Sequence, residues 1–362
     1  MNIVNVMWAG GSAYLSVHKV HQQILSQAGE NATITSWLLQ GRGVCCSIGQ
    51  TREWHLPHRL LKGRLLWRLL RPWLRLRLRR ALQQGGAQVL LLDGLGVARL
   101  MLPVLEKMPE VRATVLFHGS TRLHPQDIRL LRMVPAERLT IAAVSSTLAT
   151  ALEKDLGRPV QAVRIALDPH AFQRNLLSVT QARQALGLPS DGQVMGAVGR
   201  LVDSKGFDFL LEVFARASAD QPALRLVILG EGEMRPHLEA RIDSLGLAGR
   251  VVLGGHRPDL TRLYRAFDWL LVPSRSEGLG LVVQEAVMAG VPVLCSDLPV
   301  FREQLGDLQC YLPIADIDAW TAALQRCATR SPGELAHAQL EALAPELAWE
   351  RFCERSAQML QR

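Results

Sequence analysis

Two cations follow a short apolar segment near the middle of the chain, at a spacing that suits a diphosphate. The segment Val194–Val198 is followed by Gly199, and then by Arg200 and Lys205 within the run GRLVDSKG. Arginine offers a bidentate fork and lysine a point charge, so the pair can converge on one diphosphate beside a helix N-terminus. The alternative is a solvated surface loop, which an isolated Arg and Lys would favour.

Two glutamates stand in a later loop and in the helix that follows it. Glu277 comes after the apolar segment Trp269–Val272, in PSRSEGLGLVVQEA, and the helix is expected to begin near Gly280, with Glu285 more than one turn inside it. One carboxylate beside exposed loop amides and a second, deeper one can each bind a pair of vicinal hydroxyls on a sugar nucleotide. Coincidence is the alternative, because such pairs of glutamates are common.

Other turns of small residues end apolar segments elsewhere. Ile3–Ala9 runs into Gly10 and Gly11, where the backbone can approach a ligand closely and a following helix N-terminus can offer N–H groups to an anion. A tight strand-to-helix turn is the alternative, because the GxGxxG fingerprint is absent. Further turns of this kind are Phe117-His118-Gly119, Val144-Ser145-Ser146 and Gly230-Glu231-Gly232.

In their order along the chain, Gly-Arg…Lys-Gly at 199–206, Gly-Glu-Gly at 230–232 and Glu-x7-Glu at 277–285 resemble the GT-B-fold retaining glycosyltransferases of family 4. The sequence is similar in particular to bacterial lipopolysaccharide and cell-envelope polysaccharide glycosyltransferases, more loosely in its first half. The resemblance implies an α/β protein of the GT-B fold, with two Rossmann-like doubly wound parallel-sheet domains facing a central cleft and helices at the C-terminus. It implies no cofactor and no metal, since the nucleotide sugar is a co-substrate.

The resemblance also implies roles for residues of the second half. Arg200 and Lys205 would bind the donor diphosphate and stabilise the departing charge in place of a metal. Glu285 would hold the ribose hydroxyls and Glu277 the transferred sugar. Because no residue suggests a covalent nucleophile, the implied mechanism is a front-face displacement in which a phosphate oxygen accepts the acceptor's proton. The other implied donor-site residues are Gly199 and Gly230 at the ends of strands, the amides of Gly278, Leu279 and Gly280 beside the sugar and its phosphate, and Gly255, His256 and Arg257 against the base.

In the first half, the resemblance implies that Gly10 and Gly11 face the cleft and that His118 lies near the reactive end of the sugar. A satisfied interior histidine remains the alternative for His118. Arg164-Ile165-Ala166-Leu167-Asp168 stands where many relatives have Pro-Asn-Gly-Val-Asp. We interpret Asp168 as conformational and not catalytic.

Apolar segments alternating with amphipathic stretches must position these residues. Runs of apolar residues without in/out alternation are typical of strands buried on both faces of a parallel sheet. We expect a first domain over 1–168, a linker over 169–190, a donor domain over 191–345 and a helix over 346–362 that returns to the first domain. The predicted strands are Ile3–Ala9, Val89–Asp93, Thr114–Phe117, Thr140–Ser145 and Val160–Ile165, and then Val194–Val198, Leu224–Leu229, Val251–Leu253, Trp269–Val272 and Val291–Cys295.

The charge of the chain is concentrated in one segment. The 362 residues carry a net charge of +8, of which +9 lies between Arg52 and Arg80, so the remainder has a net charge of −1. This distribution argues against a chain that coats nucleic acid, and a hydrophobic content of 48% excludes global disorder. No apolar run is long enough to cross a membrane, no secretory leader is recognisable, and the six cysteines show no C-x-x-C pair. We expect a cytoplasmic protein.

The basic segment has two faces if it is helical. In LLKGRLLWRLLRPWLRLRLRR (60–80), five arginines form a cationic stripe within about 80° on one side: Arg64, Arg68, Arg71, Arg75 and Arg79. A Leu/Trp face that includes Trp67 and Trp73 accompanies them. This pattern favours peripheral contact with an anionic membrane, while Pro72 would kink or restart the helix. The alternatives are an ordinary helix whose leucines pack on the first sheet, and a site for an acidic acceptor or nucleic acid.

Rival metal and hydrolase patterns are weaker. Asp316-Ile317-Asp318 could bind a metal, but it precedes the helical stretch 319–327 and is more typical of a helix cap. The pairs His18/His21 and His55/His58 lack companions at metal spacing, so we interpret them as surface or packing histidines. No G-x-S-x-G elbow is present.

Together these observations predict a retaining, metal-independent hexosyltransferase-type enzyme. It would move a sugar from a nucleoside-diphosphate sugar to a glycan or glycolipid acceptor, such as a lipopolysaccharide core, at the inner face of the cytoplasmic membrane. The alternatives are a GT-B nucleotide-sugar epimerase, a soluble glucan synthase, or a non-catalytic membrane- or nucleic-acid-binding module. The sequence does not identify the donor base, the sugar, the acceptor or the oligomeric state.

Overall fold

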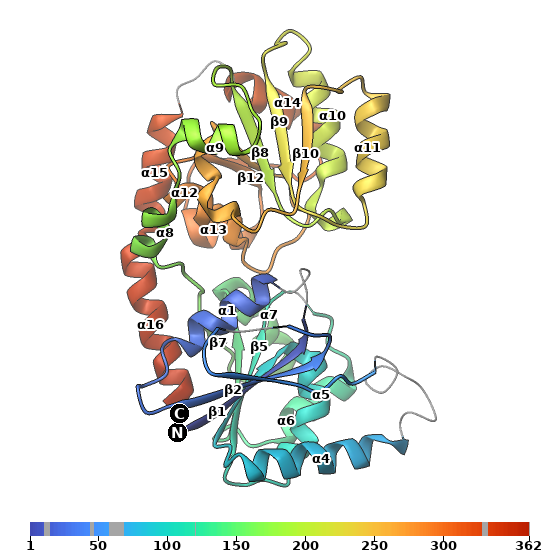
Figure 1. The fold of residues 1–362 in the computed structure, drawn as a ribbon, viewed down its shortest axis with the longest axis vertical. Helices are drawn as coiled ribbons and strands as arrows, with labels where there is room; N and C mark the ends of the chain where they lie inside the picture. Colours follow the sequence, from blue (N-terminus) through green and yellow to red (C-terminus); the bar gives the residue numbers. More distant parts are fainter. Residues whose placement is uncertain (11–14, 44–46, 58–68, 120, 328–331, 362) are drawn as a thin grey trace. The chain divides into compact units, whose positions relative to one another are not determined.

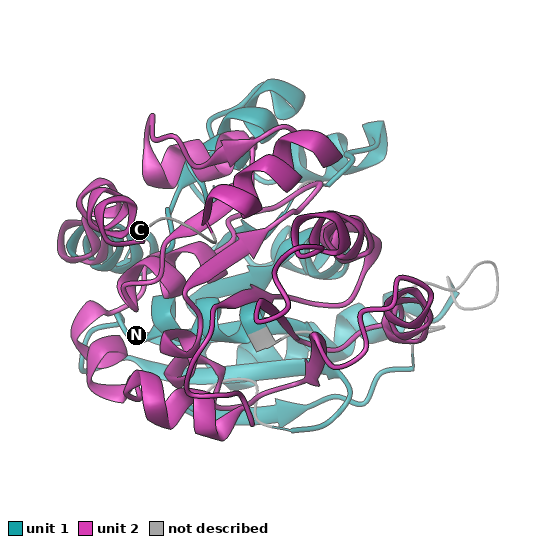
Figure 2. Ribbon diagram, turned by 90° about the horizontal axis from the view of Figure 1, so that it is seen from above, with its two compact units in different colours: residues 1–165, 350–362 teal, residues 166–349 magenta. Residues whose placement is uncertain are grey.

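The chain forms two compact units, each built on its own parallel sheet (Figure 2). The computed structural model describes residues 1–10, 15–43, 47–57, 69–119, 121–327 and 332–361. The first unit comprises Met1–Ile165 and Glu350–Arg362, and the second comprises Ala166–Trp349. Residues 169–190, expected as a linker, form helices α8 and α9 of the second unit.

The first unit has a seven-stranded parallel sheet in the order β3-β2-β1-β4-β5-β6-β7. Figure 1 labels β1, β2, β5 and β7 of this sheet. Its inner strands are continuous apolar segments such as VLLLD in β4, and they are buried on both faces as helical crossovers require. The strands are β1 (Asn2–Ala9), β2 (Thr33–Gln40), β3 (Gln50–Glu53), β4 (Val89–Asp93), β5 (Arg112–Phe117), β6 (Leu139–Ala143) and β7 (Gln161–Ala162). The helices are α1 (Leu15–Leu25), α4 (Arg71–Gln84), α5 (Gly94–Leu105), α6 (Pro125–Met133), α7 (Ser146–Leu156) and, from residue 350 on, α16 (Pro345–Gln361).

The second unit repeats this winding with a six-stranded parallel sheet in the order β10-β9-β8-β11-β12-β13. The strands are β8 (Val194–Val198), β9 (Arg225–Leu229), β10 (Val251–Gly255), β11 (Trp269–Val272), β12 (Val293–Ser296) and β13 (Tyr311–Leu312). The helices are α8 (Pro169–Asn175), α9 (Val179–Ala185), α10 (Phe207–Ala217), α11 (Arg235–Ser244), α12 (Leu281–Met288), α13 (Pro299–Leu305), α14 (Ile317–Cys327) and α15 (Gly333–Leu343).

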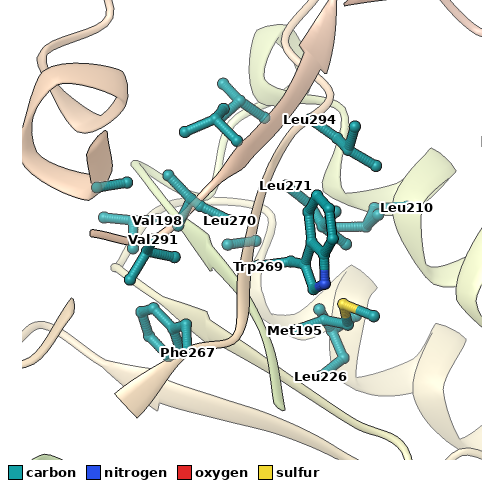
Figure 3. Packing of buried hydrophobic residues seen from close by; sticks show 14 of the residues in the cluster. Met195, Val198, Leu210, Leu226, Phe267, Trp269, Leu270, Leu271, Val291 and Leu294 are labelled. Atoms are coloured by element: carbon teal, nitrogen blue, oxygen red, sulfur yellow. The ribbon is translucent and has the colours of Figure 1, made fainter. Parts of the chain in front are cut away.

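The core of the second unit lies between the sheet and its helices. Figure 3 shows Trp269 and Leu271 of β11 beside Met195 of β8 and Leu210 of α10. Helix α10 buries apolar residues at helical spacing, from Phe207 through Leu210, Leu211 and Phe214, so one face packs on the sheet. This packing holds the ends of β8 and β11 in fixed positions.

The structure confirms the prediction of two Rossmann-like doubly wound sheets and corrects details of it. Strands β2, β3 and β13 were not predicted; β3 (QTRE) is a short strand at the sheet's edge without an apolar pattern, and β13 has only two residues. Asp168 Oδ1 accepts the N–H of Ala171 at 2.9 Å, and Asp316 Oδ1 accepts that of Ala319 at 3.0 Å. Both side chains therefore cap the start of a helix, as expected for Asp316 and in keeping with a conformational role for Asp168. Among the described residues, no helix is both long and apolar enough to span a bilayer.

Candidate functional site

In the second unit the predicted donor residues follow β8 and β11, the neighbouring strands where the winding reverses direction. Ligands of doubly wound sheets bind at the carboxyl ends of the strands at this switch point. Arg200 follows β8 directly, Lys205 ends a 3₁₀ turn (Asp203–Lys205), and Glu277 lies in the loop after β11. The fold therefore brings together residues from two segments that are far apart in sequence.

Lys205 and Glu277 form a mostly buried ion pair in which the Lys205 ammonium donates to Glu277 Oε1. Their side chains are 19% and 8% exposed, and the Ser274 hydroxyl donates to the same oxygen at 2.8 Å. The lysine ammonium has three N–H bonds, and Glu277 is its only ion-pair partner within the described ranges. Arg200 is exposed and has no ion-pair partner in that part of the chain. Both cations can thus accept an anion.

Arg275 ties the two loops together. Its guanidinium donates to Asp203 Oδ1 at 2.8 Å and pairs with Asp208 Oδ2 at 3.2 Å, while its backbone N–H donates to the Ser204 carbonyl at 2.8 Å. These contacts fix the turn that carries Lys205 against the loop that carries Glu277. Sequence reasoning missed Arg275 and Ser274, because their partners lie some 70 residues earlier or depend on the loop's conformation.

Two glycines allow the loops to approach each other. Gly206 has φ +68°, and a Cβ there would lie 2.3 Å from the Pro273 carbonyl oxygen. Gly230, which follows β9, would place a Cβ 1.8 Å from the Gly199 carbonyl oxygen. Larger residues would therefore separate the loops that carry the predicted donor residues.

Glu285 lies inside α12, as expected, and is buried. The hydroxyl of the buried Tyr264 donates to Glu285 Oε2 at 2.5 Å, and burial together with the nearby Glu285 charge raises the pKa of Tyr264 well above its usual value. Helix α12 begins after Gly280, as predicted, and Gly278 and Leu279 precede it in the loop. Sequence reasoning missed Tyr264, because nothing in its surroundings signals a polar partner 21 residues later.

The loop after β10 holds the residues predicted to contact the base. Gly255 ends the strand, its carbonyl accepts the N–H of Gly230 at 2.8 Å, and His256 is exposed. Arg257 donates to both carboxylate oxygens of Asp259, at 3.0 and 3.1 Å, and to the Ala185 carbonyl at 3.2 Å. Its guanidinium is thus held within the protein, and its role toward a base stays a prediction.

In the first unit His118 follows β5 and contacts a residue that was not predicted as part of a site. His118 Nε2 lies 3.1 Å from His21 Nε2, and His21 Nδ1 lies 2.7 Å from Asn5 Oδ1. His18 and His21 are buried, so the packing interpretation holds for them and the surface one does not; His55 is exposed and pairs with Glu53, and His58 lies outside the described residues. Gly10 donates its N–H to the Gln40 carbonyl at 3.1 Å, and Gly11 lies outside the described residues.

Asp93, at the end of β4, is a further buried group beside His118, whose Nε2 is 3.7 Å from Asp93 Oδ1. Burial raises the pKa of Asp93 to about 6, although the Trp8 N–H donates to its Oδ2 at 3.1 Å. Burial lowers the pKa of His118 to about 4. Asp93 was not predicted as a site residue, although it is the last residue of the predicted strand Val89–Asp93, and that position could have pointed to it.

The basic segment is described only from Leu69 on, so Arg64, Arg68 and Trp67 lie outside the described residues. Helix α4 begins at Arg71 with Pro72 in its first turn, which confirms that proline starts a helix here. The predicted exposed stripe needs correction, because Arg71 and Arg75 are half-buried beside the buried face of the helix. Leu69, Trp73, Leu76, Arg77 and Arg80 are exposed instead.

The chain was compared with known families and proteins, and the family match lies within the second unit. Residues 178–339 match the family of glycosyl transferases group 1. A 2-deoxystreptamine glucosyltransferase from Streptomyces kanamyceticus is 30% identical over 220 residues, which cover 56% of this chain and 57% of that protein. A lipopolysaccharide core biosynthesis glycosyltransferase from Rhizobium meliloti is 32% identical over 146 residues, or 40% and 42% of the two chains. The matches thus span about half the length of these relatives.

Solved structures resemble the whole chain. HepE from Anabaena, in complex with UDP and glucose, has a TM-score of 0.76 at 17% identity, covering 99% of this chain and 98% of its own. A glycosyltransferase from Rickettsia africae has a TM-score of 0.78 at 13% identity, covering 100% and 99%. At these identities the likeness shows the GT-B fold alone. The family match adds that residues 178–339 of this chain are similar to the glycosyl transferases group 1.

Proposed function

We propose that this protein transfers a sugar from a nucleoside-diphosphate sugar to a cell-envelope glycan acceptor, keeping the anomeric configuration. The observation that carries the proposal is the group formed by exposed Arg200 and the Lys205–Glu277 pair at the ends of β8 and β11. Two cations suit a diphosphate, and a buried, oriented carboxylate beside them suits sugar hydroxyls. Relatives named as glycosyltransferases support this reading over an epimerase or a non-catalytic module.

The proposed reaction needs no group beyond those of the chain and its substrates. The bond between C1 of the sugar and the diphosphate oxygen breaks while the acceptor oxygen bonds to C1 on the same face. The acceptor's proton passes to an oxygen of the departing phosphate. Arg200 and Lys205 stabilise the charge on the diphosphate as it leaves, a role that a divalent metal fills in other enzymes. Glu277 would orient the sugar and Glu285 the ribose.

The acceptor and its location rest on helix α4. The helix contains five arginines and no acidic residue, and its exposed face combines Trp73 and Leu76 with Arg77 and Arg80. Such a face suits an anionic lipid interface, where arginine stems bury their methylenes and place the charge at the headgroups. Lipopolysaccharide core enzymes are among the relatives, so a phosphorylated, lipid-linked glycan is the acceptor we favour.

Activity assays with matched variants test the transfer. Incubating the protein with UDP-, GDP-, ADP- and dTDP-sugars and a lipopolysaccharide-core acceptor should release the nucleoside diphosphate from at least one donor, with or without EDTA, and NMR of the glycoside formed should show the donor's anomeric configuration. Lys205→Met should lower kcat/KM by roughly 100-fold or more, the usual effect of removing one charge-stabilising donor. The exposed Lys154→Met is the control.

A stability measurement separates chemistry from folding. Lys205→Met leaves the Glu277 carboxylate buried without its cation, which should cost about 1–3 kcal/mol of stability. Adding Glu277→Gln should restore much of that stability but none of the activity. Release of the nucleoside diphosphate by Lys205→Met within a few-fold of the wild-type rate would contradict the role assigned to Lys205. Inversion of the configuration at C1 would contradict the retaining mechanism.

A further inference from the structure

A chain of buried polar side chains runs through the first unit and ends at His118. Asn5 on β1 donates its amide N–H to Ser36 Oγ on β2 at 3.1 Å. Its Oδ1 lies 2.7 Å from Nδ1 of His21 on α1, and His21 Nε2 lies 3.1 Å from His118 Nε2. Ser36, Asn5 and His21 are each 0% exposed, whereas the side chain of His118 is 17% exposed.

The chain has a direction, which fixes the tautomers of both histidines. The side-chain amide oxygen of Asn5, Oδ1, can only accept a hydrogen bond. His21 therefore carries its proton on Nδ1 and presents a lone pair at Nε2. His118 must then donate from its own Nε2–H, which leaves His118 Nδ1 as an acceptor. Burial lowers the pKa of His21 well below its usual value, and the charges of His118 and His18 lower it further, so the ring stays neutral.

This series of hydrogen-bonded side chains contributes little to the stability of the fold. A satisfied buried hydrogen bond contributes only about 1 kcal/mol net, and apolar residues of the same shape would fill the space between β1 and α1 about as well. What the polar residues add is orientation, because each hydrogen bond restricts the ring that follows it. The rings of His21 and His118 lie with centroids 5.1 Å apart and planes 28° apart. His118, at the end of this series, is its only member that is exposed to solvent.

We infer that His21 is a positioning residue that holds His118 in the Nε2–H tautomer, with Nδ1 presented as a hydrogen-bond acceptor for a hydroxyl of the sugar. The part that concerns the sugar rests on the proposed function. Without His21, the His118 Nε2 has no hydrogen-bond partner among the described residues, because Asp93 Oδ1 is 3.7 Å away, so nothing selects the Nε2–H tautomer or the ring's orientation. His21 thus acts through His118 and needs no contact with the substrate.

Nitrogen NMR of the imidazole rings tests the tautomer directly, without any substrate. In the wild-type protein near neutral pH, His118 should show a protonated Nε2 and a bare Nδ1, with signals assigned by their loss in His118→Gln. His21→Phe keeps the ring volume but removes both hydrogen bonds, and should shift His118 toward a mixture of tautomers. His21→Gln places an amide oxygen near the position of Nε2 and should restore the wild-type spectrum. His18→Phe, which loses the hydrogen bond to the Ala9 carbonyl and none to His21 or His118, is the control on the same helix.

A kinetic double-mutant cycle then tests the link to catalysis. His21→Phe should lower kcat about three- to tenfold, as the loss of one net hydrogen bond predicts, and His21→Gln should recover most of it. In a His118→Gln background, His21→Phe should have no further effect on kcat. Equal losses in both backgrounds would show a merely structural role and overturn the inference.

The NMR arm has its own contrary outcome. Signals showing His118 and His21 both bare at Nε2 would overturn the inference in favour of a bound metal, because Nε2 of both rings and a carboxylate oxygen of Asp93 lie within 4.8 Å of one another. A wild-type His118 spectrum in His21→Phe would also overturn it. If no nucleotide sugar is consumed, the proposed function fails while the tautomer result stands on its own.

Discussion

At the scale of single residues, burial shifts the pKa values of Asp93 and His118 in opposite directions. The native carboxyl, with a pKa of about 6, holds its proton at pH values where an unfolded chain has lost it. The native imidazole, with a pKa of about 4, is neutral where an unfolded chain is charged. Between about pH 4 and pH 6, folding therefore takes up a proton at Asp93 and releases one from His118.

Because the two shifts are opposite, we expect the contributions of Asp93 and His118 to the pH dependence of the free energy of unfolding to cancel largely in the wild-type protein. The contribution of Asp93 to the free energy of unfolding falls as pH rises from about 4 to 6, and that of His118 rises from about 4 to 6.5, by about 3 kcal/mol each. Relative to wild type, Asp93→Asn should therefore become more stable as pH rises through this range, and His118→Gln less stable. Urea unfolding at about pH 4, 5 and 6.5 measures both differences.

The exposed Asp155→Asn variant is the control for loss of a surface carboxylate. If the difference between Asp93→Asn and wild type is the same at all three pH values, burial does not hold the Asp93 proton and the account of this pair is wrong.

Candidate site residues could be picked out from the sequence where they belong to a recognisable motif. They could not be picked out where their role depends on a partner that is distant in sequence. Arg200, Lys205, Glu277 and Glu285 were proposed as donor residues because Gly-Arg…Lys-Gly and Glu-x7-Glu are local patterns. His21 was not, because on sequence alone it is a histidine on an amphipathic helix. Its role follows from Asn5 and His118, which are 16 and 97 residues away.

At the scale of elements, the second unit depends on how closely the turn before α10 approaches the loop after β11. Gly206 forms the junction between the turn that ends at Lys205 and the start of α10. Gly246 has nearly the same backbone conformation, φ +65°, but a Cβ there meets nothing within 4 Å. The two glycines therefore separate the cost of the left-handed conformation from that of the close approach.

Substituting alanine at each position tests this approach. Gly246→Ala should cost about 1 kcal/mol of stability, because alanine disfavours positive φ. Gly206→Ala should cost about 1–3 kcal/mol more through its clash with the Pro273 carbonyl, and should weaken binding of a nucleoside diphosphate at least tenfold by moving Lys205 away from Glu277. Urea unfolding and calorimetric titration measure the two effects. Equal results for both variants would show that the close approach is unimportant.

Helix α4 is the element that carries the proposed contact with a membrane. Its buried face, Leu74, Leu78, Ala81 and Leu82, packs within the unit. The guanidinium of the exposed Arg77 lies 5.7 Å from the ring of the exposed Trp73 and 5.4 Å from the ring of the buried Trp54. Cationic and aromatic side chains thus meet on one surface, as at a lipid interface.

Flotation with vesicles tests this surface. The vesicles contain phosphatidylcholine with or without roughly one third phosphatidylglycerol. Arg77→Gln with Arg80→Gln should lower binding to the anionic vesicles by at least tenfold, since each basic residue contributes about 1 kcal/mol. Arg122→Gln with Arg129→Gln removes the same charge from exposed positions of the same unit and is the control. Equal binding of wild type and both double variants would end the membrane proposal.

At the scale of the whole molecule, the two sheets share one winding, in which strand order reverses beside the first strand of each. Most of the buried strands were predicted to within a few residues, because continuous apolar runs leave few alternatives, but β2 was missed, because polar residues interrupt its sequence TITSWLLQ. The edge strands β3 and β13 were not predicted either, because pairing with a neighbour defines them and their own sequences carry no pattern. The charge is also distributed unevenly along the chain. Residues 52–80 carry a net charge of +9, whereas the proposed diphosphate site in the second unit uses only Arg200 and Lys205.

The central claim is that Arg200 and Lys205 bind the diphosphate of a nucleotide, and calorimetric titration tests it most directly. UDP, GDP, ADP and dTDP, and the nucleosides that correspond to them, are titrated into wild type and into Lys205→Met with Glu277→Gln. We predict that wild type binds at least one diphosphate, binds its nucleoside at least about 100-fold more weakly, and loses at least about tenfold in affinity for the diphosphate in the double variant. Binding of none of the diphosphates, or equal affinity for a diphosphate and its nucleoside, would contradict the account.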